Sequence, residues 1–234
     1  MIIASNVSKK FGKLKALDNV SVACNKGECI ALIGPNASGK TTLIKTILGM
    51  VVQDSGFITF NGFNILHNWQ YRDQIGYMPQ TARYPDNMTI GHVLDMMKDI
   101  RGIKATLDED LVDAFELKTL IHKRMRTLSG GTRQKISASL AFLFSPAVLI
   151  LDEPTAGLDP VASELLKEKI IKEKKKGKLI MITSHILSEL DDLVTQVIYM
   201  QDGQVRFHKS IGELRSETGE EKLNKAIAQF MSRR

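Results

Sequence analysis

The stretch from Gly34 to Thr42 reads GPNASGKTT and fits the pattern G-x-x-x-x-G-K-[ST]. In such loops, backbone N–H groups at a helix N-terminus surround phosphate oxygens, and Gly39 lets the backbone approach them closely. Lys40 brings a cation to the β and γ oxygens, while the hydroxyl of Thr41 suits Mg²⁺. We therefore predict a site for a nucleoside triphosphate and Mg²⁺. Its loop consists of Gly34, Pro35, Asn36, Ala37, Ser38, Gly39, Lys40, Thr41 and Thr42.

Ala37 stands in this loop at a position where a further glycine is common. If its backbone has a positive φ, the Cβ atom costs on the order of 1 kcal/mol. That cost is small beside a domain stability of about 5–15 kcal/mol. We expect a slightly strained loop that keeps its phosphate-binding N–H groups.

Two carboxylates follow the apolar run AVLIL, which predicts a buried strand. Asp152, at the end of that strand, is placed to hold Mg²⁺ directly or through water. Glu153 comes next and could polarise a water molecule for attack on the γ-phosphorus. The pair adds hydrolytic chemistry to the predicted phosphate site.

A second glycine-rich segment, TLSGGTRQK, precedes a long helical pattern. Ser129, Gly130 and Gly131 would sit at the N-terminus of that helix, where free N–H groups and the helix dipole favour anions. One γ-phosphate does not need two such sites from one chain. We therefore expect the second site to serve a nucleotide held by another copy.

The elements that must position these residues alternate between strands and helices. Strands are predicted over 1–7, 14–24, 28–33, 56–62, 147–152 and 178–184, followed by a hairpin over 196–208 with Asp202-Gly203 at its turn. Helices are predicted over 40–49, 89–102, 107–117, 130–145, 160–176 and 186–194. The pattern predicts a single α/β domain over 1–234. A helical insert occupies approximately 81–145, and a short helical tail approximately 209–234.

Composition narrows the class of protein. The chain has 234 residues with a formal net charge of +6. Its opening has no leader pattern, and no apolar run approaches the roughly twenty residues of a membrane-spanning helix, so we expect a cytoplasmic protein. The basic run Lys167–Lys178 mixes charges at helical spacing and predicts a solvated helix face. Without a nucleic-acid-binding motif we predict no nucleic acid partner. Cys24 and Cys29 are predicted to be buried strand thiols.

Six segments in this order resemble the motifs of the ATP-binding subunit of ATP-binding cassette (ABC) transporters. They are GPNASGKTT, YMPQ ending in Gln80, LSGGTRQK, LILDEP with Glu153, GLDP with Asp159, and TSH with His185. In addition, KKFG places Phe11 where an aromatic ring usually stacks on adenine. The resemblance covers nearly the whole chain.

This resemblance implies a P-loop NTPase (RecA-like) core with an N-terminal antiparallel β region and an α-helical subdomain insert. It implies that two copies meet head to tail, with ATP between the phosphate loop of one and Ser129–Gly131 of the other. The implied catalytic residues are Glu153, His185, Lys40 and Gln80, and the implied metal ligands are Thr41, Gln80 and Asp152. Asp159 would contact the opposite subunit.

The implied partners are a second copy of the chain and one or more integral membrane transporter subunits. The continuation GTRQK is similar to cassettes that serve ABC-2-type membrane subunits, which favours export or mechanical work at the cytoplasmic face of the cell membrane. A periplasmic or extracytoplasmic accessory protein is compatible with the resemblance. More narrowly, MVVQDSG and WQYRDQIGYMPQTARYPDNMTIG resemble the cassette of the copper-related system that matures bacterial nitrous-oxide reductase.

The main alternative is a non-transport ABC ATPase that acts on nucleic acid or ribosomes. DNA-repair relatives carry long coiled coils between Lys40 and Asp152, and this segment is too short for them; ribosome-acting relatives usually fuse two cassettes. A small P-loop kinase would lack LSGG. A binding module without catalysis would lack Glu153 or His185. The sequence therefore disfavours a non-transport ABC ATPase, a small kinase and a binding module without catalysis.

Overall fold

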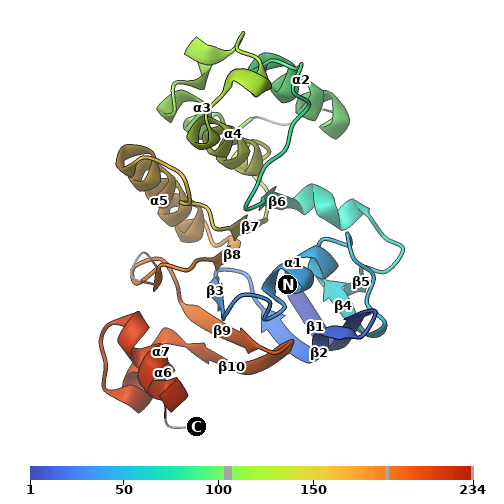
Figure 1. Cartoon of the computed structure of the whole chain (residues 1–234), viewed down its shortest axis with the longest axis vertical. Helices are drawn as coiled ribbons and strands as arrows, with labels where there is room; N and C mark the ends of the chain where they lie inside the picture. The colour runs from blue at the N-terminus through green and yellow to red at the C-terminus, as the bar shows by residue number, and fades with distance from the viewer. Residues whose placement is uncertain (103–106, 188–189, 233–234) are drawn as a thin grey trace.

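The structure is a computed structural model that describes residues 1–102, 107–187 and 190–232. In these ranges the chain forms two sheets and several helices. Figure 1 shows the strands in the middle of the molecule, one group of helices at one end, and the C-terminal helices at the other. No helix within these ranges is both long and apolar enough to cross a membrane.

The larger sheet has six strands in the order β10-β9-β3-β8-β7-β6. In chain order they are β3 (Cys29–Ile33), β6 (Ile75–Met78), β7 (Val148–Asp152), β8 (Leu179–Thr183), β9 (Gln196–Gln201) and β10 (Gln204–Ser210). All neighbours pair in parallel except β9 and β10. Strands β3, β7 and β8 are buried along their whole length. Their unbroken apolar sequences fit a parallel sheet, because both of its faces are covered.

The predicted hairpin is confirmed as β9–β10. Its turn residues Asp202 and Gly203 have φ values of 52° and 75°, the positive values that a tight type I′ turn requires. The N–H of Gly203 donates to the carbonyl oxygen of Ser38 at 3.1 Å. The turn therefore supports the phosphate loop from a distant part of the chain.

The smaller sheet is antiparallel and has the order β2-β1-β4-β5. Its strands are β1 (Ile2–Phe11), β2 (Leu14–Cys24), β4 (Ser55–Phe60) and β5 (Phe63–Asn64). Helix α1 (Lys40–Ile47) packs its apolar face into the core that both sheets share, where Leu43 and Ile44 join Leu17 and Ile30. Both cysteines are buried and unpaired, as predicted, and burial raises the pKa of each thiol to about 12.

The remaining helices form two groups. Helices α2 (Ile90–Arg101), α3 (Asp110–Ala114) and α4 (Gly130–Phe142) gather at the upper end in Figure 1, with short 3₁₀ helices η2 (Leu117–Leu120) and η3 (Met125–Thr127). Helix α5 (Pro160–Lys175) leads back to the sheet, and α6 (Ile211–Thr218) and α7 (Leu223–Ser232) lie together at the other end. A further 3₁₀ helix, η1 (Gln70–Gln74), precedes β6.

The structure confirms the predicted α/β core, antiparallel β region and helical insert; the limits of the insert and of the tail stay predictions. Sequence reasoning missed β6, because four residues with a glycine give no strand pattern. Gly76 serves packing instead, since a Cβ there would lie 1.9 Å from the carbonyl oxygen of Ala141 in α4. The predicted helix over 186–194 includes residues 188–189, which lie outside the described ranges, and residues 190–193 form a bend and turns.

The prediction of a solvated face over Lys167–Lys178 is wrong for two of its residues. The side chains of Lys169 and Glu173 are only 3% and 0% exposed, and their charged atoms lie 3.0 Å apart. The Nζ atom of Lys169 also lies 2.5 Å from Asp108 and 3.0 Å from Asp110. These acids come from the helical insert, so the ion pairs attach the insert to α5.

The buried carboxylate of Glu173 is stabilised by cations. Burial alone would raise its pKa, but hydrogen bonds from Lys176, Lys178 and Lys169 lower the pKa of Glu173 from 4.5 to about 2. A carboxyl whose pKa is lower in the folded state stabilises the fold above its ordinary pKa. This contribution is lost as the pH falls from about 4.5 towards 2.

We predict that Glu173→Gln lowers the free energy of unfolding at pH 7 by about 1–3 kcal/mol, because the buried ammonium group of Lys169 loses one of its carboxylate partners. The difference from the wild type should shrink as the pH falls below 4.5. Urea unfolding at pH 7, 4 and 3 measures both effects. Glu164→Gln, at an exposed carboxylate of the same helix, is the control and should change little. Equal stability of Glu173→Gln and wild type at pH 7 would contradict the prediction.

Candidate functional site

The phosphate loop connects β3 to α1 and depends on two glycines. Gly34 has a φ of 146°, and a Cβ at this residue would lie 2.0 Å from the carbonyl oxygen of Met200. Gly39 has a φ of 103°, and a Cβ there would lie 2.5 Å from the carbonyl oxygen of Ala16. Both positions therefore exclude a side chain by conformation and by space.

Ala37 has the positive φ that the sequence analysis anticipated, at 62°. An L-residue in this region costs on the order of 1 kcal/mol. The loop nevertheless leads directly into α1, whose N-cap is Gly39. The departure from glycine is therefore a local strain that the surrounding loop accommodates.

Lys40 lies at the first turn of α1 and folds back over the loop. Its Nζ atom donates to the carbonyl oxygens of Gly34, at 2.8 Å, and Pro35, at 3.0 Å. Burial lowers the pKa of Lys40, against the opposing effect of the Glu153 and Asp152 carboxylates. The cation therefore lies where backbone oxygens and two nearby acids both attract it.

One cavity of about 240 Å³ brings most of the predicted residues together. They come from the phosphate loop and the start of α1, from the last residues of β1 and β7, and from the residues after β6, β7 and β8. The predicted residues that line the cavity are Phe11, Asn36, Ala37, Ser38, Gly39, Lys40, Thr41, Thr42, Gln80, Asp152, Glu153 and His185. Sequence reasoning missed Leu14 and Ala16, which line the cavity from β2.

The two acids are positioned by Thr183, a residue to which sequence reasoning gave no role. The Thr183 hydroxyl donates to Oδ1 of Asp152 at 2.6 Å and accepts the backbone N–H of Glu153 at 2.9 Å. Glu153 has a φ of 53°, a left-handed conformation that costs a non-glycine residue about 1–2 kcal/mol. Its side chain is 12% exposed. Thr183 belongs to the segment TSH, in which the resemblance to ABC cassettes gives a role to His185 alone.

His185 faces Glu153 across the cavity. The Nε2 atom of His185 lies 3.3 Å from Oε1 of Glu153, and the backbone N–H of His185 donates to Oε2 at 3.3 Å. The imidazole is about half exposed, whereas the carboxylate is nearly buried. Two groups able to accept or donate protons therefore meet at the edge of the phosphate site.

The glycine-rich segment of the insert lies elsewhere. Among the described residues that line the cavity there is none of Ser129, Gly130 or Gly131. Ser129 caps α4 by accepting the N–H of Thr132 at 3.1 Å, and Ser129 and Gly130 are exposed. This helix N-terminus is therefore accessible from outside, as an anion site for a second copy requires.

Helix α4 nevertheless contacts the catalytic loop of its own chain. Gln134 is buried and its Nε2 atom donates to the carbonyl oxygen of Glu153 at 3.4 Å. Lys135 pairs with Asp159 at 2.7 Å, and Asp159 in turn caps α5. Hydrogen bonds from Lys135 and from the Ala162 N–H lower the pKa of Asp159. Gln134 and Lys135 both belong to the segment LSGGTRQK, but the sequence pattern predicts no role for either side chain.

The residues predicted to hold Mg²⁺ fit a hard cation. Thr41, Gln80 and Asp152 line the same cavity and offer a hydroxyl, an amide and a carboxylate. Oxygen ligands of these kinds, few in number, suit Mg²⁺ bound together with phosphate. Asp152 is held in place by the Thr183 hydroxyl. The donor set therefore agrees with the predicted ion.

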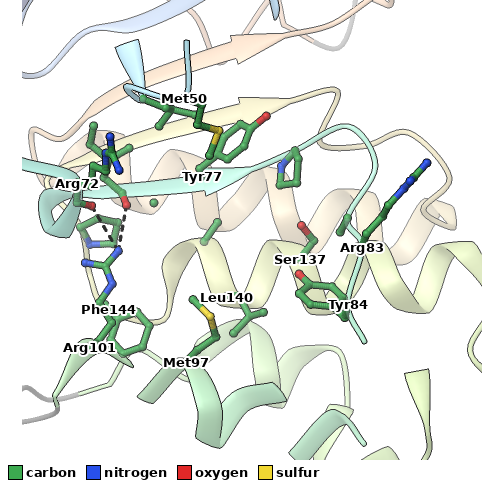
Figure 2. Close-up of a pocket in the computed structure, with 17 residues that line it drawn as sticks. Met50, Arg72, Tyr77, Arg83, Tyr84, Met97, Arg101, Ser137, Leu140 and Phe144 are labelled. Atoms are coloured by element: carbon green, nitrogen blue, oxygen red, sulfur yellow. Dashed lines mark hydrogen bonds between the residues drawn. The ribbon is translucent and has the colours of Figure 1, made fainter. Parts of the chain in front are cut away.

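A second cavity, of about 340 Å³, lies between β6 and α4 (Figure 2). Met97, Leu140 and Phe144 give it an apolar lining on the α4 side of β6, and Tyr77 lines it beside Met50 on the other side of the strand. Its charged residues are Arg72, Arg83 and Arg101, and no described residue that lines it is acidic. Arg101 donates to the carbonyl oxygen of Asp73 at 2.7 Å and lies over the Phe144 ring. Pro79 lines this cavity, and the next residue, Gln80, lines the phosphate cavity.

Known proteins resemble the chain in sequence. The family profile of ABC transporters matches residues 17–156. The lantibiotic transport ATP-binding protein SrtF of Streptococcus pyogenes is 33% identical over 229 residues, which cover 97% of each chain. The phospholipid-transporting ATPase ABCA3 of Rattus norvegicus is 36% identical over 230 residues. That match covers 93% of this chain but 13% of ABCA3, so the chain spans only a small part of this relative.

Solved structures share the fold. An ATP-binding subunit of an ABC transporter superposes with a TM-score of 0.91 at 27% identity, covering 99% of both chains. A dimeric cassette in a post-hydrolysis state, bound to ADP and phosphate, has a TM-score of 0.81 at 22% identity and shows the fold alone. It covers 90% of this chain and 99% of its own. With the profile match over more than half of the chain and the full-length similarity to SrtF, these findings show that the chain belongs to the ABC transporter family as an ATP-binding ATPase cassette.

Proposed function

We propose that the chain is the ATP-hydrolysing subunit of an ABC transporter and drives a separate membrane subunit. The observation that carries this proposal is the shared cavity, in which the phosphate loop meets Asp152, Glu153 and His185. The cavity supplies a cation and backbone donors for phosphate and a carboxylate for water activation. A small kinase would not need the helix end at Ser129–Gly131 as well, and a binding module without catalysis would be expected to lack Glu153 or His185.

In the proposed mechanism the phosphate loop binds the triphosphate through its backbone N–H groups, and Lys40 approaches the β and γ oxygens. Phe11 is half exposed at the mouth of the cavity and offers its ring to the base. Thr41, Asp152 and Gln80 would hold Mg²⁺, which when bound neutralises the charge that develops on the phosphates. Gln80 also connects this site to the second cavity, through Pro79.

Glu153 is the proposed general base or water-positioning residue. Its carboxylate is nearly buried and lies 3.3 Å from the imidazole of His185. A water molecule held by Glu153 would approach the γ-phosphorus from the side opposite the leaving group. His185 would contact the γ-phosphate and keep Glu153 oriented.

A second copy would complete each site. Ser129 and Gly130 are exposed and do not reach the cavity of their own chain. Two copies arranged head to tail would place this helix end against the γ-phosphate held by the partner. ATP would then close the dimer and hydrolysis would open it. A solved cassette with the same fold is dimeric and holds ADP and phosphate, which supports the proposal of a dimer.

The apolar, arginine-bearing cavity between β6 and α4 is the proposed docking site of the membrane subunit. Its lining favours a cytosolic segment that presents apolar side chains together with a carboxylate, because the described lining includes Arg72 and Arg83 and no acid, whereas Arg101 already pairs with Asp73 at 3.2 Å. The position beside Gln80 would let docking sense the nucleotide. The subunit would therefore work at the cytoplasmic face of a membrane.

The ABC-2-type partner and the export direction rest on the sequence resemblance and on relatives named for phospholipid and lantibiotic transport. The narrower resemblance to the cassette of nitrous-oxide reductase maturation also stays a prediction, as does an extracytoplasmic accessory protein. Identifying the membrane protein that co-purifies with the chain tests these points together.

We predict that Glu153→Gln lowers the kcat of ATP hydrolysis by about 100-fold or more, because the water loses its base. The variant should still bind ATP and should accumulate as a closed dimer in size-exclusion chromatography with ATP. Glu168→Gln, at an exposed carboxylate of α5, is the matched control and should hydrolyse ATP normally. Hydrolysis by Glu153→Gln at the wild-type rate would show that the assigned role is wrong.

We predict that Ser129→Arg abolishes turnover but leaves ATP binding by the isolated subunit within about threefold of wild type, because Ser129 acts on the nucleotide of the other copy. Steady-state hydrolysis and equilibrium binding of a fluorescent ATP analogue measure the two properties. Ser216→Arg, on the exposed side of α6, controls for the added charge. Normal turnover by Ser129→Arg would rule out a site completed by two copies.

We predict that Arg83→Glu prevents co-purification with the membrane subunit, because a carboxylate would repel the acidic group expected there. ATP binding by the variant should be unchanged. Arg215→Glu, exposed on α6, has the same charge change far along the chain and should leave the complex intact. Retention of the membrane subunit by Arg83→Glu would argue against docking at this cavity.

A further inference from the structure

Thr183 is the last residue of β8 and is 1% exposed. In the parallel register, Thr183 lies opposite Asp152, the last residue of β7. Its hydroxyl donates to Oδ1 of Asp152 at 2.6 Å. A hydroxyl has one hydrogen, so its lone pairs must then face its other neighbour, the N–H of Glu153, at 2.9 Å.

The peptide groups of Glu153 are held on both sides. The carbonyl oxygen of Thr183 accepts the same N–H at 3.2 Å, and Gln134 donates to the carbonyl oxygen of Glu153 at 3.4 Å. Glu153 adopts a φ of 53°, and a non-glycine residue persists in that conformation only where its surroundings impose it. Asp152 therefore orients the Thr183 hydroxyl, and the hydroxyl helps impose the backbone conformation that aims the Glu153 side chain.

We propose that Thr183 is a positioning residue for ATP hydrolysis and acts through Glu153. The inference rests on the proposed function, in which Glu153 is the general base or water-positioning residue. Thr183 does not line the cavity in which ATP would bind, so its effect is on the direction of the carboxylate. A valine would keep the shape of the side chain but could neither donate to Asp152 nor accept from Glu153.

The substitution Thr183→Val should lower kcat about tenfold to a hundredfold, since small misplacements of a catalytic group have effects of this size. The KM for ATP should change by less than about threefold, because the phosphate loop is untouched and Asp152, which loses one hydrogen bond, stays at the end of the buried strand β7. Thr183→Ser retains the hydroxyl and should restore most of kcat. A role in folding alone would leave kcat of the folded protein unchanged.

Thr218→Val is the matched control. Thr218 is also buried, and its hydroxyl donates to the carbonyl oxygen of Leu214 within α6. This variant should show wild-type kcat, even if its thermal midpoint falls. Equal kcat for Thr183→Val and Thr218→Val would overturn the proposal.

Whether Thr183 acts through Glu153 is tested by combining Thr183→Val with Glu153→Gln in one protein. In the Glu153→Gln background, Thr183→Val should lower the single-turnover rate less than about twofold, because coupled residues are not additive. The same fold loss in both backgrounds would overturn the proposal, as would failure of Thr183→Ser to restore kcat. Failure of the proposed function has a different signature, namely wild-type hydrolysis by Glu153→Gln itself.

Discussion

The site depends on the parallel pairing of β3, β7 and β8. Parallel strands end at the same edge of a sheet. The pairing therefore brings together the phosphate loop after β3, Asp152 at the end of β7 and Thr183 at the end of β8. The register of β7 on β8 places Asp152 opposite Thr183. A shift by one residue would turn Asp152 to the other face of the sheet and separate the acid from its hydroxyl partner.

Around this edge the backbone is held in conformations that the residues alone would not choose. Ala37 and Glu153 both have positive φ values although they carry a Cβ atom. Glu153 is held in this conformation by hydrogen bonds with Thr183 and Gln134. Since Gln134 belongs to α4, the helix that bears the exposed Ser129 end also supports the catalytic loop of its own chain.

The sequence predicts a functional residue where residue types and their spacing together point to one kind of chemistry. The order of strand, loop and helix predicts where the phosphate loop, Asp152 and Glu153 lie, whereas His185 is expected only from the resemblance to ABC cassettes; the structure brings these residues to one cavity. The sequence was uninformative where a role depends on tertiary contact. Nothing in KEKIIKEKKKGK distinguishes buried Lys169 from solvated lysines, because its partner Asp108 lies 61 residues away. Thr183 was overlooked for the same reason, since its hydroxyl acquires meaning only opposite Asp152.

The hydrogen bond from Gly203 to Ser38 has a consequence for biosynthesis. The loop that would hold phosphate follows β3, whereas the turn that supports it lies between β9 and β10 and is synthesised much later than the loop. A ribosome-bound chain therefore lacks this support until the β9–β10 hairpin has emerged. Strands β3 and β9 are neighbours in the sheet although they are far apart in the chain, so this pairing is a slow, non-local step. Nucleotide binding by the emerging chain should accordingly begin only after the β9–β10 hairpin has left the ribosome.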